Sequence, residues 1–173
     1  QGPLASALER MERNCPRPAE PMGEAWFMGA QREMYTYLKE RRLDELDAQE
    51  LERPLVEIAT GNSCFGPLPE WKAWLEYLLP RMAVLSLQPH RRELQELLVT
   101  CLMTQYAPGF AEAPYRQFGA DVLQTLGACI MDGSKWSEGK IVPGRVLHDW
   151  QPEERHGWGW WEASGDLSSS LFL

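Results

Sequence analysis

Residues 89–106, PHRRELQELLVTCLMTQY, carry the cleanest periodic pattern in the chain and decide its fold class. Apolar residues recur there at intervals of three and four positions, the spacing that lines one face of an α-helix. They are Leu94, Leu97, Leu98, Cys101 and Leu102. Polar residues fill most positions between them, so this stretch predicts an amphipathic helix with its apolar side facing a core.

Apolar residues with helical spacing also occur earlier in the chain. From Met22 to about Arg42 the apolar positions are Phe27, Ala30, Met34 and Leu38. Next, Asp47 with Glu50 forms a capping box at the start of another predicted helix. The apolar side of that helix comprises Leu51, Leu55, Ile58 and Ala59. We expect Pro54 to kink this helix or to split it in two.

Two further helices are predicted on either side of residues 89–106. The earlier one begins near Pro69, and Pro80 and Pro89 are expected to end it. Its apolar stripe comprises Trp71, Trp74, Leu75, Leu78 and Met82. The later helix is expected over about 114–131, with an inward side made by Phe118, Val122, Leu123, Leu126, Cys129 and Ile130.

The two ends of the chain are less regular. Residues 1–21 predict a short helix around Leu4 to Arg13 and a proline-rich connector, which we expect to lie over the surface. After residue 132 the helical pattern fades, and KIVPGRVL (140–147) is either a small hairpin or irregular chain. The tryptophan-rich stretch HGWGWWEASGD (156–166) follows, and a short helix is expected near the end.

These elements predict one all-α domain of five to six helices in stacked antiparallel hairpins. Residues 22–132 form its helical core, and 133–173 form an irregular Trp-rich segment with a short terminal helix. Tyr37-Leu38-x-x-Arg41 recurs forty residues later as Tyr77-Leu78-x-x-Arg81. A period near forty with two helices per unit is typical of HEAT-like arrays, and a compact irregular bundle is the alternative.

Charge narrows the classes of partner. The 173 residues carry a formal net charge of −8, and the basic runs are short and lie beside acids. Nucleic-acid binding requires a positive face, so we exclude it. No apolar run is long enough to span a membrane, and the first twenty residues lack the apolar core of a signal peptide. Widely spaced cysteines without a CxxC pair agree with a cytoplasmic protein.

Candidate chemistry is sparse. Cys64, in a glycine-rich loop before a helix, is the best nucleophile candidate, because a helix N-terminus lowers a thiol pKa. His148, Asp149 and either Glu153 or His156 could be assembled as a metal site, because they cluster within nine residues. We favour a packed loop for Cys64 and a solvated loop for the histidine cluster, because neither shows the spacing of an assembled site. The sequence therefore predicts no catalytic residue, no metal and no cofactor.

Partner binding is the remaining hypothesis. Trp150, Trp158, Trp160 and Trp161 crowd one segment. Adjacent residues of a helix or strand point in different directions, so we expect most of these rings to seal the core and at least one to reach a seam or partner. The alternative is an aromatic cage or stacking platform for a cation or sugar. The acidic residues Glu45, Glu50 and Glu57 form either a solvated helix face or a docking surface.

We therefore expect a non-enzymatic cytoplasmic protein-interaction domain, an adaptor or an inhibitor or immunity-type protein. It would bind a protein partner through an acidic and aromatic surface, which suits a basic partner, and homo-oligomerisation stays open. The alternative is a small enzyme or ligand-binding protein with a pocket near Cys64 or near His148 to His156.

Overall fold

The computed structural model describes residues 3–22, 24–27, 30–60, 68–87, 93–106, 109–128, 136–137 and 140–141. Within them the chain forms six α-helices: α1 (Ala5–Asn14), α2 (Tyr37–Glu40), α3 (Ala48–Thr60), α4 (Leu68–Leu85), α5 (Glu93–Gln105) and α6 (Phe118–Val122). Two 3₁₀ turns, η1 (Leu43–Glu45) and η3 (Phe110–Glu112), and a π-helical turn, η4 (Leu123–Gly127), join them. The described part of the chain is mostly helical, as the sequence predicts.

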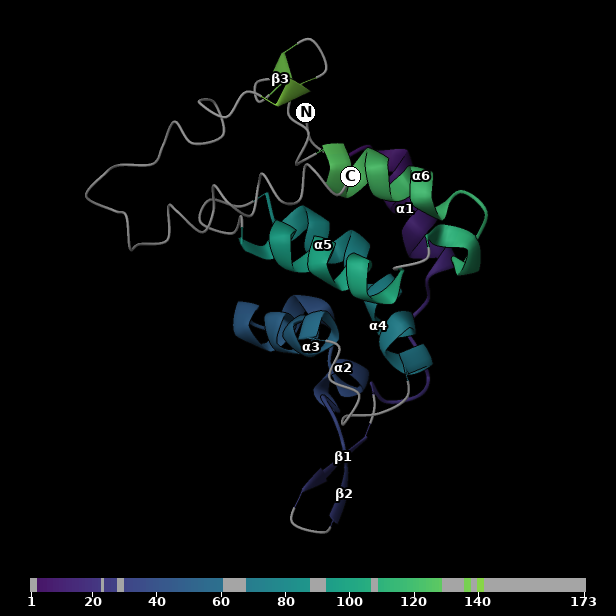
Figure 1. The fold of residues 1–173 in the computed structure, drawn as a ribbon. Helices are drawn as coiled ribbons and strands as arrows, with labels where there is room; N and C mark the ends of the chain where they lie inside the picture. Colours follow the sequence, from purple (N-terminus) through teal and green to yellow (C-terminus); the bar gives the residue numbers. More distant parts are fainter. Residues whose placement is uncertain are drawn as a thin grey trace, which may run out of the picture.

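Helix α4 lies at the centre of the helical body. It contacts α1, α3 and α5, while α3 packs along α5 and α1 packs against α6 (Figure 1). The five residues of its predicted stripe, Trp71, Trp74, Leu75, Leu78 and Met82, are all buried. Leu94, Leu98, Cys101 and Leu102 of α5 are buried as well. The apolar stripes of α4 and α5, which predicted helices from the sequence, therefore form much of the core.

The predicted start of α3 is confirmed atom by atom. The backbone N–H of Glu50 donates to Oδ1 of Asp47 at 2.8 Å, and the backbone N–H of Asp47 donates to Oε2 of Glu50 at 3.0 Å. This reciprocal pair is a capping box, which satisfies donors that the first helical turn leaves free. Pro54 lies inside one continuous helix and does not split it.

The helix predicted from Met22 to Arg42 is wrong over its first half. Strands β1 (Glu24–Phe27) and β2 (Ala30–Glu33) pair there as an antiparallel hairpin, with Phe27 opposite Ala30. Glycines at 23 and 29 disfavour a helix, and the adjacent Trp26 and Phe27 favour a strand. Tyr35 then has a φ of 52°, which keeps the four-residue α2 separate from the hairpin.

Three smaller expectations also need correction. Helix α1 belongs to the core rather than to the surface, because Ala7 and Met11 are fully buried. Helix α4 continues through Pro80 to Leu85, where buried neighbours pack its last turns. Leu123, expected to face inward, is exposed. Val122 and Leu126 of the same predicted side are buried, and Leu123 lies about 100° further round the helix than Val122.

The repeat and the C-terminal segment are less well defined. The two Tyr-Leu-x-x-Arg copies begin on helices of 4 and 18 residues, and Leu38 and Leu78 are both buried. Strands β3 (Trp136–Ser137) and β4 (Lys140–Ile141) form a second antiparallel hairpin. The rest of KIVPGRVL and the Trp-rich stretch lie outside the described residues.

None of the helices in the described ranges combines the length and apolar character that crossing a membrane requires.

Candidate functional site: an arginine-lined groove

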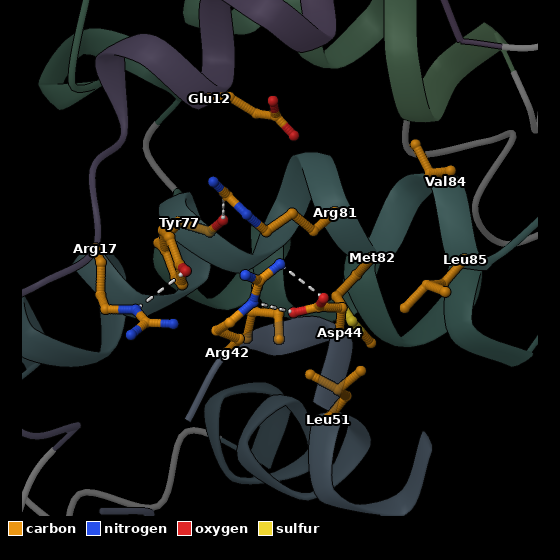
Figure 2. A pocket seen from close by; sticks show the side chains of 11 residues that line it. Glu12, Arg17, Arg42, Asp44, Leu51, Tyr77, Arg81, Met82, Val84 and Leu85 are labelled. Carbon is orange, nitrogen blue, oxygen red and sulfur yellow. Dashed lines mark hydrogen bonds and ion pairs between the residues drawn. The ribbon is translucent and has the colours of Figure 1, made fainter. Parts of the chain in front are cut away.

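A groove of about 530 Å³ opens beside the second half of α4 (Figure 2). Its lining comes from the end of α1 and the segment after it, from η1, from α3 and from α4. The lining residues are Glu12, Arg17, Arg42, Leu43, Asp44, Leu51, Tyr77, Arg81, Met82, Val84 and Leu85. The volume falls within the range that accommodates a small ligand or a short segment of a larger one.

Helix α4 gives the groove two chemically different ends. Tyr77 and Arg81 are four residues apart and therefore share one face of the helix, and Val84 and Leu85 follow one turn further on. Figure 2 shows Arg17, Tyr77 and Arg42 gathered at one end and Val84 and Leu85 at the other. From Tyr77 to Leu85 the helix rises about 12 Å. The groove is thus polar at one end and aliphatic at the other.

Tyr77 organises the polar end. Its hydroxyl accepts a hydrogen bond of 3.1 Å from Nε of Arg17, and the guanidinium of Arg81 stacks over its ring with Cζ 4.2 Å from the centroid. Nη1 of Arg81 also donates to the Tyr77 carbonyl at 2.6 Å. Trp74 meets the same ring edge-on, with centroids 5.7 Å apart. The phenol is 6 % exposed, so these contacts hold it in one position with its O–H at the groove.

Arg17 fastens the proline-rich connector to the groove. Besides Tyr77, it donates to the carbonyls of Lys39 at 3.4 Å and Arg41 at 2.8 Å. Arg41 in turn binds the Glu50 carboxylate at 2.7 Å. The connector, the end of α2 and the start of α3 are therefore held around the same tyrosine.

Arg42 and Asp44 neutralise one another at the rim. Nε and Nη2 of Arg42 donate to the two carboxylate oxygens of Asp44 at 2.9 and 2.8 Å. These hydrogen bonds hold the pKa of Asp44 below its usual value. Both side chains are exposed, so the pair contributes little to folding stability.

Arg17 and Arg81 have no such partner in the part of the chain that the structure describes. The ion pairs among the described residues are Arg10–Asp121, Arg41–Glu50, Arg42–Asp44 and Lys72–Glu112, and none includes Arg17 or Arg81. A guanidinium has five N–H donors, and Arg81 uses one of them in the bond to the Tyr77 carbonyl. The polar end therefore combines positive charge, spare donors and a buried phenol, which is the chemistry that binds an anion.

A second cavity, of about 430 Å³, lies between α4 and α5 and is lined by Lys72, Glu76, Gln105 and their neighbours. The hydroxyl of Tyr106 donates to Glu76, and Lys72 pairs with Glu112 at 3.7 Å. Burial raises the pKa of Glu76. Because its charged groups already engage one another, this cavity offers less to a charged ligand than the arginine groove does.

The three acids expected at a docking surface are placed differently from one another. Glu45 is exposed, whereas Glu50 and Glu57 are half-buried. Glu50 holds Arg41, and Glu57 accepts a hydrogen bond of 3.2 Å from the Tyr35 hydroxyl. Of these three acids, Glu45 is therefore the one whose exposed side chain is available to a partner.

The other expected site residues are not tested. Trp150, Trp158, Trp160, Trp161, Cys64, His148, Asp149, Glu153 and His156 lie outside the described residues. Cys15 and Cys101 are described and buried, and burial raises the pKa of each thiol to about 12. In the described ranges no group of three His, Cys, Asp or Glu side chains is placed to hold a metal ion.

The groove could not be predicted from the sequence. Tyr77 and Arg81 stand out as part of a repeat, yet the i, i+4 pairing of a tyrosine with an arginine is common on helices. Arg17 lies sixty residues earlier, between two prolines. Only the fold shows that these three side chains meet.

Comparisons with known proteins do not identify the chain: it matches no protein family, no curated protein and no solved structure.

Proposed function

We propose that this protein is a non-enzymatic protein-interaction domain that docks an acidic segment of its partner in the arginine groove. The observation that carries this proposal is the pair Arg17 and Arg81, two guanidiniums beside the buried Tyr77 that form no ion pair with another described residue. Recognition of acidic motifs by arginine clusters is a recurrent mode of peptide binding.

The shape of the groove supports a protein segment as the occupant. Sites for small molecules usually enclose most of the ligand surface. Here Arg17, Arg42, Asp44 and Val84 are exposed along the rim, so a bound molecule would stay open to solvent on one side. A length of about 12 Å corresponds to about four residues of extended chain.

The net charge of −8 narrows the class of protein that can bind as a partner. Long-range attraction favours a basic partner, whereas the groove selects an acidic segment by short-range contacts. A partner that is basic overall and presents an acidic motif would satisfy both. Glu45 and the four tryptophans expected at an interface stay part of this proposal, as a second contact surface.

The test is a comparison of three baits in the lysate of the cells that produce the protein. Wild type, Arg81→Glu and Arg53→Glu would be immobilised, each after circular dichroism has shown it folded. Arg53 is an exposed arginine of α3 outside the groove and serves as the matched control. We expect one protein that wild type and Arg53→Glu enrich and Arg81→Glu does not; equal capture by all three baits contradicts docking in the groove.

We also propose the finer features of the fold, the location and the oligomeric state that the sequence suggests. A HEAT-like stack, a Trp-rich seal at the C-terminal end, a cytoplasmic location and homo-oligomerisation are compatible with the helical body. The enzyme alternative rests on Cys64 or on His148 to His156. It predicts loss of an activity on Cys64→Ser, a change that a binding domain would tolerate.

A further inference from the structure

The groove lining holds the three arginines Arg17, Arg42 and Arg81 and the two acids Glu12 and Asp44, so its net charge is positive by one. Arg42 is neutralised by Asp44, and Glu12 is the other acid in the lining. Arg17 and Arg81 together bring two positive charges without an ion pair among the described residues. Charge thus favours an anion, and the hydrogen-bond donors decide between a carboxylate, with one negative charge, and a phosphate monoester, with about 1.5 to 2 at neutral pH.

The number of free donors favours a phosphate over a carboxylate. Arg17 uses three N–H groups, on the Tyr77 hydroxyl and on two carbonyls. Arg81 uses one. The Tyr77 oxygen accepts from Arg17, so its own O–H can donate into the groove. Donors from three side chains, Arg17, Arg81 and Tyr77, suit the three terminal oxygens of a phosphoryl group better than the two oxygens of a carboxylate.

The aliphatic end sets a further requirement. Met82, Val84 and Leu85 follow Arg81 within about 6 Å along the helix, and Leu51 of α3 completes that wall. In an extended segment, side chains two residues apart lie on one side at about 7 Å. An aliphatic residue two positions from the anion would therefore reach Val84 and Leu85.

From these observations we propose that the groove recognises a phosphorylated serine or threonine of a partner protein, with an aliphatic residue two positions away. This inference rests on the proposed function and names the chemistry of its docking motif. Arg81 and the Tyr77 hydroxyl bind the phosphate, Arg17 adds charge and holds Tyr77 in place, and the α4–α3 wall takes the aliphatic side chain.

Fluorescence anisotropy on the full chain tests the proposal. The probes are three labelled hexapeptides, identical except for phosphoserine, glutamate or serine two positions before a leucine, and a second set with the leucine two positions before that residue. In one of the two orientations we expect the phosphopeptide to bind about tenfold tighter than the glutamate peptide, and the serine peptide not to bind measurably.

Variants locate the interaction. Arg81→Gln should weaken phosphopeptide binding about tenfold or more, and Tyr77→Phe should weaken it less. Arg53→Gln, the matched change outside the groove, should leave it unchanged. Replacing the leucine of the peptide by glycine should also lower the affinity, and unfolding curves of each variant separate loss of binding from loss of fold.

The outcomes separate the two levels of the proposal. A glutamate peptide that binds as tightly as the phosphopeptide would overturn phosphate recognition and leave acidic docking intact. If no peptide of either set binds, both proposals fail. Free O-phosphoserine that competes as well as the phosphopeptide, concentration for concentration, would show a small-phosphate site and overturn the protein segment as occupant.

Discussion

Two arginine sites in this protein have opposite surroundings. At the seam between α1 and α6, Arg10 donates to both carboxylate oxygens of Asp121, with a shortest distance of 2.6 Å, and the Tyr115 hydroxyl donates to the same carboxylate at 2.8 Å. Asp121 is 1 % exposed. In the groove, Arg81 contacts the ring and the carbonyl oxygen of Tyr77, and no carboxylate of the described residues forms an ion pair with it.

The comparison distinguishes charges that stabilise the fold from charges that can bind a ligand. The seam brings its own anion, so its hydrogen-bonding capacity serves the packing of α1 on α6. Among the described residues no carboxylate forms an ion pair with Arg17 or Arg81, although Glu12 and Asp44 also line the groove. A groove with a net positive charge in an acidic protein is the better candidate for a ligand.

The largest effect is expected at the seam. Asp121→Asn keeps the shape but removes the charge that Arg10 and Tyr115 bind, and we expect a loss of about 2 kcal/mol in the free energy of unfolding. Urea denaturation followed by tryptophan fluorescence measures it. A loss below about 0.5 kcal/mol would show that the seam is no more structural than a surface pair.

The same seam predicts a dependence on pH. Hydrogen bonds from Arg10, chiefly, hold the pKa of Asp121 below its usual value in the folded state. The stabilisation is therefore complete above the unfolded pKa of about 4, and it is lost as pH falls through the lower, folded pKa. Thermal melts from pH 6 to pH 2 should show a shallower decline for Asp121→Asn than for wild type. Parallel declines would mean that Asp121 does not contribute to acid unfolding.

The same contrast explains what the sequence could predict. The α5 stripe and the Asp47–Glu50 capping box depend on residues within one or two turns, and both are confirmed. The seam and the groove depend on pairs such as Arg10 with Asp121 and Arg17 with Tyr77, which are 111 and 60 residues apart. Spacing within a helix contains no information about such contacts.

The β1–β2 hairpin shows a different limit. Phe27, Ala30 and Met34 satisfy the helical period, yet the backbone there is extended up to Glu33. Four apolar residues among many polar ones match a three-to-four spacing by chance, and the glycines at 23 and 29 were the stronger local indication. The helix that does form, α2, is one turn long and places Leu38 in the core.

A smaller loss of stability is expected in the groove. Arg81→Gln removes the stacking on Tyr77, and we expect about 0.5–1 kcal/mol less stability, together with the loss of anion binding described above. Asp121→Asn should show the reverse: a larger loss of stability and unchanged binding in the folded protein. Chemical denaturation and peptide titration on both variants measure the contrast, and loss of binding in Asp121→Asn at temperatures where it is folded would contradict it.

The smallest effect on stability, and the most informative about charge, is expected for Asp44→Asn. This change releases Arg42 from its exposed pair, so the unfolding midpoint should not move, while the affinity for the phosphopeptide should rise about threefold at low salt. The gain should shrink in 1 M salt, where screening acts within about 3 Å.

The control is Glu9→Gln, an equal charge change on an exposed residue of α1 outside the groove lining, which should give a smaller gain in affinity. If Asp44→Asn instead weakens binding, Asp44 positions Arg42 for the ligand, and the groove takes its anion with all three arginines already fixed in place.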